Sequence, residues 1–424
     1  METGSTPPTP FRPFRSSFLF AMGLFLALNW ALSFYTPFNF DPYKFGYRGW
    51  AWWTMNDLRK QQQTNNVALL GSSLMVSAIA GCDSNYLGRG LDLANYHKAS
   101  YFEHLLRTRF GGTFNTFSLA APGQMPSDAL LTLKAMVNTA QRPDIVIYGV
   151  APRDFVDSTL SSPADTEPFR YLRRLVNADD LTDVAFRKSD DKLEWWLERA
   201  VYLYGSSLDF RLAFIDGANK FLTAAFPTPW TKQPFTWWDR VRLLPRYMPG
   251  EIHPEAVMAG PITRQTAQFK DNTLEYMSRY RNPDPHTYKL QFHFLKELAE
   301  FCHKERMELI VVNMPITLYN AGMLPPGAYN RYLNDLQIFA GANGTSFYDL
   351  ANFPLYEQRA DFHDSVHLNA FGAKKFFDSL ATTLQSNNRS SSLIVMSGQN
   401  MEKHQALAQR QKEEAEKKKL DPVM

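Results

Sequence analysis

The chain has 424 residues, of which 45% are apolar and 21% are charged, and its formal net charge is +3. This is the composition of a folded protein with a sizeable core, and so small a net charge gives no argument for binding nucleic acid. The two cysteines, Cys82 and Cys302, are too few for a disulfide scaffold or a cysteine-based zinc module.

The N-terminal region carries the strongest compositional signal. Residues 16–35 are uncharged over the length that a helix needs to cross a bilayer, and Arg12 and Arg15 precede them. The positive-inside bias then predicts a disordered cytoplasmic terminus over 1–15, a transmembrane anchor over 16–36 and an extracytoplasmic remainder, periplasmic in a Gram-negative-type cell. A cleaved signal peptide and a buried core helix are the alternatives, although the run is longer than a usual signal and lacks a clear A-x-A site.

From residue 67 onward, short apolar strands alternate with helical segments. This alternation predicts an α/β fold, and strands without polar positions are typical of a parallel sheet covered on both faces. The five candidate strands are residues 67–70, 113–119, 144–150, 309–314 and 346–350.

Two helices of the C-terminal half show a clear apolar stripe. The first lies in the stretch "KLQFHFLKELAEFCHKERM", with Leu290, Phe294, Leu298 and Phe301 on one side and Cys302 beside them. The final core helix begins near Asn369, a favourable N-cap residue. We expect this helix to bury Phe376, Phe377, Leu380 and Leu384.

The third and fourth candidate strands are more than 150 residues apart, too far for a single crossover helix. About residues 157–280 are therefore predicted to be a mostly helical insertion in the domain that spans 37–384. It is either a second small core on the sheet edge, or a lid over a substrate groove or a surface that leans on the membrane. Residues 385–424 are predicted to be a mobile charged tail. Five of the nine tryptophans lie in the insertion: Trp195, Trp196, Trp230, Trp237 and Trp238.

The sequence Asp364-Ser365-Val366-His367 places an aspartate three residues before a histidine, in a loop that leads into a helix. A nucleophilic serine needs a base to take its proton, and that base needs an acceptor that holds its tautomer and stabilises its cation. One loop supplies both groups at this spacing. Two other interpretations are a helix-capping aspartate with a surface histidine, and a metal site formed by His363, Asp364 and His367.

The tripeptide Gly-Ser-Ser occurs twice. Gly71–Ser73 ends the first candidate strand, and Asp364 and His367 follow the fifth, so a parallel sheet would bring them to the same edge. Ser73 would then lie at a helix N-terminus, where unpaired N–H groups favour developing negative charge. Gly205–Ser207 ends a helical stripe inside the insertion and is not predicted to be a nucleophile turn.

With these residues in place, the chain resembles the SGNH (GDSL-like) hydrolase superfamily over about residues 67–384, apart from the insertion. The resemblance implies a three-layer sandwich with a parallel, flavodoxin-like five-stranded sheet. The family's Gly-Asp-Ser block corresponds to Gly71-Ser72-Ser73 and makes Ser73 the nucleophile. Serine at position 72 resembles the Gly-Ser-Ser form of the D-alanyl-transfer proteins of teichoic acid modification, which are single-pass and face outward. The second block corresponds to Gly123, whose N–H would join that of Ser73 in the oxyanion hole.

The third block of the family departs from its pattern here. It normally supplies an asparagine to the oxyanion, whereas "YGVAPRDF" offers Gly149, Arg153 and Asp154. Losing one oxyanion donor typically costs about 10²–10³ in turnover unless another group replaces it. Arg153 either replaces the donor or binds an anionic group of the substrate, or it forms a salt bridge to Asp154 or a neighbouring helix. The same stretch is similar to a widespread membrane-anchored bacterial branch of the superfamily.

The resemblance implies a membrane-anchored, outward-facing serine esterase or O-acyltransferase with Ser73, His367 and Asp364 as its triad. A glycan or other envelope polymer is the expected substrate, and a membrane O-acyltransferase is a candidate partner. The alternative function is a non-catalytic envelope assembly or binding protein on a degenerate SGNH scaffold, which the changes at position 72 and in the third block favour. Neither a metal nor a cofactor is expected.

Overall fold

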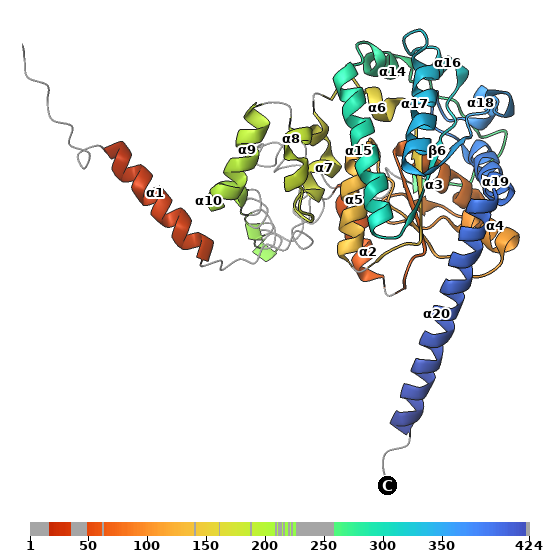
Figure 1. Ribbon diagram of the computed structural model, residues 1–424, viewed down its shortest axis with the longest axis horizontal. Coiled ribbons are helices and arrows are strands. Elements are labelled where there is room, and N and C mark those ends of the chain that lie inside the picture. Colours follow the sequence, from red (N-terminus) through yellow and green to blue (C-terminus); the bar gives the residue numbers. More distant parts are fainter. Residues whose placement is uncertain are drawn as a thin grey trace, which may run out of the picture. The chain divides into compact units, whose positions relative to one another are not determined.

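The chain divides into two compact units in the computed structural model (Figure 1). The smaller unit comprises Met1–Phe45 and Arg187–Arg246, and the larger comprises Gly46–Phe186 and Tyr247–Met424. The structure describes residues 17–34, 49–61, 63–139, 141–160, 162–186, 189–207, scattered positions between 210 and 225, and 258–420.

Five parallel strands form the central sheet of the larger unit, in the order β3-β1-β4-β6-β7. Counted along the chain, this is the order 2-1-3-4-5 of flavodoxin-like folds, so the predicted fold class is confirmed. The strands are β1 (Val67–Gly71), β3 (Thr116–Ser118), β4 (Ile145–Val150), β6 (Glu308–Asn313) and β7 (Ser346–Asp349).

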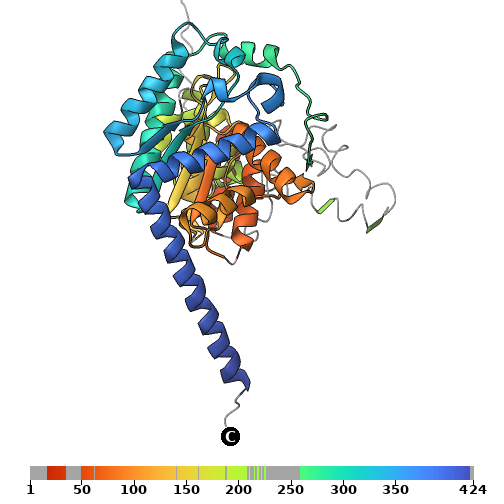
Figure 2. The ribbon, with the colours of Figure 1, turned by 90° about the vertical axis from the view of Figure 1, so that its right-hand side faces the viewer.

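Helices cover both faces of this sheet, which explains why its strands are apolar on both sides (Figures 1 and 2). One layer consists of α3 (Ser73–Leu87), α4 (Ser100–Phe110) and α19 (Ala370–Ser386). The other consists of α5 (Pro126–Asn138), α15 (Pro285–Lys304) and α17 (Ala328–Asn343).

The two helices with an apolar stripe form as predicted. Leu290, Phe294 and Leu298 are buried on α15, while Phe301 is half-buried. Asn369 caps α19, because its side-chain oxygen accepts the N–H groups of Phe371 at 2.9 Å and Gly372 at 3.2 Å. The four expected side chains of α19 are all buried: Phe376, Phe377, Leu380 and Leu384.

The predicted insertion is divided between the two units. Its first part, 162–186, packs in the larger unit, where Phe169, Tyr171 and Leu172 are buried. Its last part returns to the same unit through β5 (Met258–Ala259), which pairs antiparallel with β2 (Leu91–Asp92). Trp230, Trp237 and Trp238 lie outside the described residues.

The short elements of the larger unit are α2 (Trp50–Lys60), α6 (Arg153–Val156), η2 (Pro163–Asp165), α7 (Glu167–Leu172), η3 (Asp179–Leu181), α8 (Thr182–Ala185), α14 (Thr273–Tyr280), α16 (Leu318–Ala321), η5 (Phe353–Leu355) and α18 (Gln358–Asp361).

The smaller unit contains α1 (Ser17–Phe34), α9 (Ser189–Ala200) and α10 (Tyr202–Gly205). In the described part of the chain, α1 is the one helix long and apolar enough to cross a membrane, with a mean hydropathy of 1.7, and a signal sequence would pass the same test. Asn29 of α1 accepts the N–H of Leu203 at 3.0 Å. Because α10 ends at Gly205, the second Gly-Ser-Ser is a helix end, as predicted.

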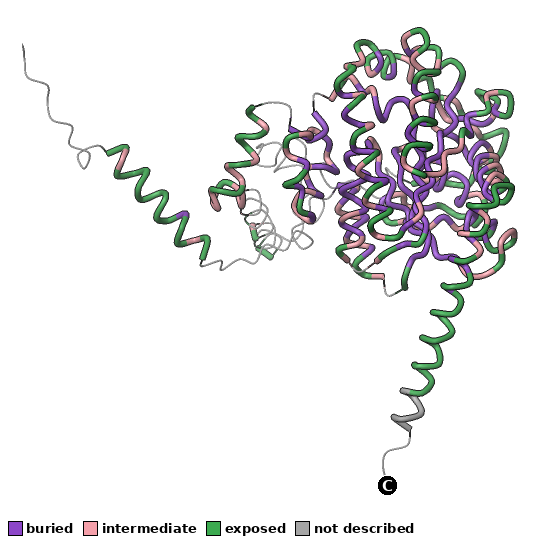
Figure 3. Tube along the Cα trace, in the orientation of Figure 1, coloured by how far each residue is buried: buried purple, intermediate pink, exposed green. Residues whose placement is uncertain are grey.

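The prediction of a mobile tail from residue 385 is wrong for the first part of that segment. Helix α20 (Asn388–Leu420) follows α19 and packs against the larger unit before it extends away from it (Figures 2 and 3). Ile394 is 1% exposed, and Ser397 Oγ donates to Asp144 Oδ2 at 2.7 Å. Ile394 lies in the apolar run Leu393–Met396, and Met401 follows seven residues after Ile394 on the same side of the helix, so an apolar signal was present within the polar segment.

We expect Ile394→Ala to lower the free energy of unfolding by about 2–4 kcal/mol, because it removes a fully buried aliphatic side chain. Leu407→Ala is the matched control on the same helix, where the side chain is 56% exposed, and it should change stability by less than about 0.5 kcal/mol. Denaturant unfolding followed by circular dichroism measures both. Equal, negligible effects would show that α20 does not dock.

Candidate active site

The turn after β1 depends on glycine. Gly71 has a φ of +153°, and a Cβ there would lie 2.7 Å from Met75 Cβ and 2.9 Å from the carbonyl oxygen of Gly149 on β4. This close approach lets the chain leave the strand sharply, so that Ser72 becomes the N-cap residue and Ser73 the first residue of α3. Ser73 is half-buried at the carboxyl edge of the sheet.

The structure brings Ser73, His367 and Asp364 together in one hydrogen-bonded line. Ser73 Oγ lies 2.7 Å from His367 Nε2, and His367 Nδ1 lies 2.7 Å from Asp364 Oδ2. The side chains of His367 and Asp364 are 24% and 18% exposed, so the site is open to small molecules. With Asp364 accepting the Nδ1 proton, His367 Nε2 is left to take the proton of the Ser73 hydroxyl.

Asp364 is held as an anion. Burial acts to raise its pKa, but the hydrogen bond and charge of His367 outweigh it, together with the N–H groups of Val366 and His367, and the pKa falls below its usual value. Both N–H groups donate to Asp364 Oδ1 at 2.9 Å. Asp364 is therefore anchored to its own loop by one oxygen and orients the imidazole with the other.

Two backbone N–H groups are available next to the nucleophile. The N–H of Ser73 is the first of α3, and Gly123 lies in the loop after β3 with a φ of +80°. No residue that the structure describes accepts either N–H. The predicted oxyanion donors thus both follow strand ends at the same sheet edge, on the neighbouring strands β1 and β3.

Gln124, which sequence reasoning missed, is a fully buried side chain that connects these two loops. Its Oε1 accepts the N–H of Gly71 at 2.8 Å, and its Nε2 donates to the carbonyl of Leu119 at 3.0 Å. A second backbone link runs from the N–H of Ala121 to the carbonyl of Gly71 at 3.0 Å. Removing the amide would leave buried backbone groups without partners, at a cost of about 1–3 kcal/mol.

Arg153, which stands where the family has its asparagine, reaches the loop of Gly123. Its Nη2 would lie 3.6 Å from a Cβ built on Gly123. The predicted salt bridge is present, with Asp157 as the nearer partner at 2.8 Å and Asp154 at 3.6 Å. Nη1 is buried and has no hydrogen-bond partner among the described residues. Within the described part of the chain, Nη1 is therefore held only by the longer ion pair with Asp154.

A group of buried carboxyls lies behind Arg153. Burial raises the pKa of Asp154 to about 6 despite the charge of Arg153, and it raises the pKa of Asp128 to about 7 despite hydrogen bonds from Thr166 and Met125. Burial and the charge of Asp128 together raise the pKa of Glu167 to about 7. These carboxyls take up protons in the folded state near neutral pH.

The last part of the insertion is hydrogen-bonded to the loop that carries Asp364 and His367. The N–H of Lys270 donates to the carbonyl of His363 at 2.6 Å. Asn272 Oδ1 accepts the N–H and the hydroxyl of Ser365 at 3.1 and 2.6 Å. Asn320 Nδ2 donates to the same hydroxyl at 2.9 Å. Asn272 could not be recognised in the sequence, because it lies 93 positions before the serine that it holds.

His363, Asp364 and His367 do not form the metal site that was one alternative interpretation of this loop. Both ring nitrogens of His367 are engaged, by Ser73 and by Asp364. Within the described ranges, no three His, Cys, Asp or Glu side chains converge as metal ligands. Cys82 and Cys302 are both buried and free.

A serine, a histidine and an aspartate in line at the carboxyl edge of a parallel α/β sheet can activate the serine as a nucleophile. No family model matches the chain, and no curated protein does. Among solved structures, a provisionally named acylhydrolase from Bacteroides fragilis NCTC 9343 is similar, with 7% identity and a TM-score of 0.31. The match covers 78% of this chain and 95% of that one. So distant a likeness carries no argument, and the interpretation of the site depends on its own geometry.

The buried carboxyls predict a stability that falls as pH rises. Their folded pKa values exceed the ordinary values near 4, so their contribution is fully present below about pH 4 and is lost as pH rises through 6–7. Between pH 5 and 8 the free energy of unfolding should therefore fall in the wild type. In Asp128→Asn we expect this fall to be smaller by about 2–3 kcal/mol. Denaturant unfolding at several pH values measures this, with Asp180→Asn, an exposed carboxylate, as the control. Parallel pH curves for wild type and Asp128→Asn would contradict it.

Proposed function

We propose that this chain is a serine enzyme of acyl transfer, with Ser73 as nucleophile, His367 as general base and acid, and Asp364 as the orienting carboxylate. The observation that carries the proposal is the pair of 2.7 Å contacts that join these three side chains. Their lengths are those of a base within direct reach of its nucleophile. Membership of the SGNH superfamily is part of the proposal, supported by the sheet order and by the position of each residue after its strand.

The reaction follows from these positions. Ser73 Oγ attacks the carbonyl carbon of an ester while its proton moves to His367 Nε2, and the carbonyl oxygen becomes an oxyanion. When the intermediate collapses, the ester C–O bond breaks and the leaving alkoxide takes the proton from Nε2. Water or an acceptor hydroxyl then attacks the acyl-serine, passes its proton to Nε2 and releases Ser73 as the proton returns.

The oxyanion needs donors, and we assign three. The N–H groups of Ser73 and Gly123 are two of them, and the guanidinium of Arg153 is the third, in place of the family's asparagine. The approach of Arg153 Nη2 to the Gly123 loop supports this assignment. A preorganised cationic donor at this point would stabilise the charge that develops in the transition state.

The location and the substrate class are further parts of the proposal. We infer that α1 is a retained single-pass anchor and that the catalytic unit faces outward, since the apolar helix follows two arginines. An enzyme held at the outer side of a membrane meets cell-envelope polymers, so the proposed substrate is an O-acylated or acylatable glycan. A membrane O-acyltransferase would be a suitable donor of acyl groups to such an enzyme.

Labelling with a fluorophosphonate probe tests the nucleophile. We expect the wild type to be labelled and to hydrolyse p-nitrophenyl acetate, and Ser73→Ala to lose both activities. Asp364→Asn should retain its fold and lose about 10³–10⁴ in turnover, because the imidazole is no longer held in the productive tautomer. Ser207→Ala, in the second Gly-Ser-Ser, is the matched control and should match the wild type. A folded wild type that is neither labelled nor active at any pH would instead indicate a non-catalytic envelope protein.

A second test concerns Arg153. Arg153→Gln should lower kcat by about 10²–10³ with little change in KM, since the lost donor acts on the oxyanion rather than on the ground state. Arg279→Gln is the control, because Arg279 also pairs with Asp157, at 2.5 Å. We expect less than a tenfold loss from the control. Equal losses in the two variants would assign Arg153 a structural role alone.

A further inference from the structure

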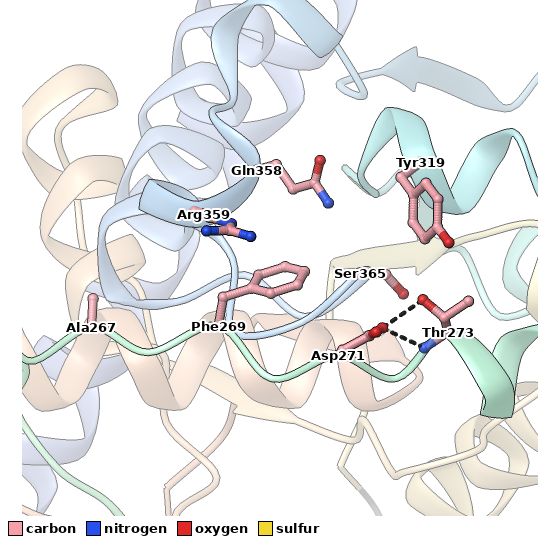
Figure 4. Close-up of a pocket in the computed structure, with 8 residues that line it drawn as sticks. All are labelled: Ala267, Phe269, Asp271, Thr273, Tyr319, Gln358, Arg359 and Ser365. Atoms are coloured by element: carbon pink, nitrogen blue, oxygen red, sulfur yellow. Dashed lines mark hydrogen bonds between the residues drawn. The ribbon is translucent and has the colours of Figure 1, made fainter.

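A cavity of about 530 Å³ opens beside the catalytic loop (Figure 4). Ser365, which lies between Asp364 and His367 in the chain, forms part of its wall. The other walls come from the last part of the insertion, from α16 and from α18. The side chains used below are Phe269, Asp271, Thr273, Tyr319, Gln358 and Arg359.

The cavity wall is bound to the loop that carries the acid–base pair. Lys270 and Asn272, which alternate along the chain with Phe269, Asp271 and Thr273, hold His363 and Ser365 by the hydrogen bonds described above. The segment thus directs one set of residues to the catalytic loop and the alternate set to the cavity. A ligand bound in the cavity would therefore lie at a defined position relative to His367.

The lining combines two aromatic rings, the partly buried Phe269 and the exposed Tyr319, with hydrogen-bonding groups of both kinds. Phe269, Tyr319 and Gln358 extend toward the space between them (Figure 4), and Tyr319 is 51% exposed. Asp271 is an acceptor, Arg359 is a donor and Gln358 can do both. Asp271 is bonded to Thr273 at 2.5 and 2.9 Å, and Arg359 forms no ion pair with any residue in the described ranges.

A second cavity of about 340 Å³ shares one lining residue, Gln358, with the first. Leu318, Phe353 and Tyr356 make it more apolar, and Thr317, which binds the carbonyl of Ser365, lies at its base. Two cavities that meet at one side chain accommodate an elongated ligand of several units better than a compact one.

We propose that these two cavities form a binding groove for a neutral glycan chain. Sugar rings present apolar C–H faces that pack on aromatic rings, and hydroxyls that both donate and accept, so they suit a lining with Phe269, Tyr319, Gln358 and Arg359. A polyanion could pair with Arg359 but would also meet the carboxylate of Asp271, so a lining with one charge of each sign suits a neutral chain better. An acyl chain alone would leave the polar groups of the first cavity without partners.

This inference rests on the proposed function in so far as it places the glycan as the substrate or acceptor of Ser73. In that arrangement one sugar hydroxyl, or its ester, reaches the serine past His367 while neighbouring sugars occupy the groove. Binding itself does not need the reaction, so the two proposals fail separately.

Calorimetric titration of the full-length Ser73→Ala chain, in a detergent without a sugar headgroup, tests the groove. The probes are the hexasaccharides of cellulose, chitin, xylan, mannan and amylose, with hexagalacturonate as the anionic comparison. We expect at least one neutral hexasaccharide to bind with a Kd of about 1 mM or tighter, and hexagalacturonate to bind more weakly.

Phe269→Ala with Tyr319→Ala, and separately the surface change Arg359→Ala, should each weaken this binding by about tenfold or more. Tyr86→Ala, an aromatic residue 46% exposed on α3, is the matched control and should bind as the parent does. Arg359→Ala keeps the test decisive if the double variant does not fold. Absence of binding by every neutral hexasaccharide, tighter binding of the anionic one, or binding unchanged in the groove variants would overturn the inference. Esterase activity of the wild type in the absence of any glycan binding would leave only the proposed function standing.

Discussion

The contact on which the site depends is the hydrogen bond between Ser73 and His367, which joins residues 294 positions apart. No local interaction can enforce such a contact. It forms because β1 and β7 run parallel in one sheet, so the segments after both strands emerge at the same edge. The burial of apolar strands between two helical layers stabilises that sheet, and the geometry of the site is therefore a consequence of the core.

The contact must also be held to within a few tenths of an ångström, and residues outside the triad do this. Gln124 connects the turn before Ser73 with the loop of Gly123, while Asn272 and Asn320 hold Ser365 from two other elements. Gln124 and Asn320 are buried and Asn272 is half-buried, and each has defined partners, which makes the arrangement costly to distort. The long insertion thus contributes directly to the catalytic loop, in addition to covering the sheet edge.

Arg153 and several buried carboxyl groups lie close to the nucleophile. Arg153 lies between the Gly123 loop and the carboxylate of Asp157, with the buried Asp154 and Asp128 behind it. Asp157 is the nearer anion, at 2.8 Å from the guanidinium against 3.6 Å for Asp154, and burial raises the pKa of Asp154 and Asp128. Such an arrangement keeps a cation in place close to the site.

The sequence alone predicted a parallel sheet, the two striped helices, and Ser73, Asp364 and His367, which the structure joins by hydrogen bonds. Their catalytic role is part of the proposal. Apolar runs and helical periodicity are local, and glycine at the end of a strand or aspartate three residues before histidine can be recognised without a partner. Gln124 and Asn272 carried no such signal, since an isolated amide in a loop has many uses and only its partner defines one. The docking of α20 through Ile394 and Ser397 and the choice of Asp157 as the main partner of Arg153 likewise depend on partners distant in the chain. These features were decided by the tertiary structure, because they are contacts between segments far apart in the chain, whereas the pattern of apolar residues along each segment was enough to predict a parallel α/β sheet.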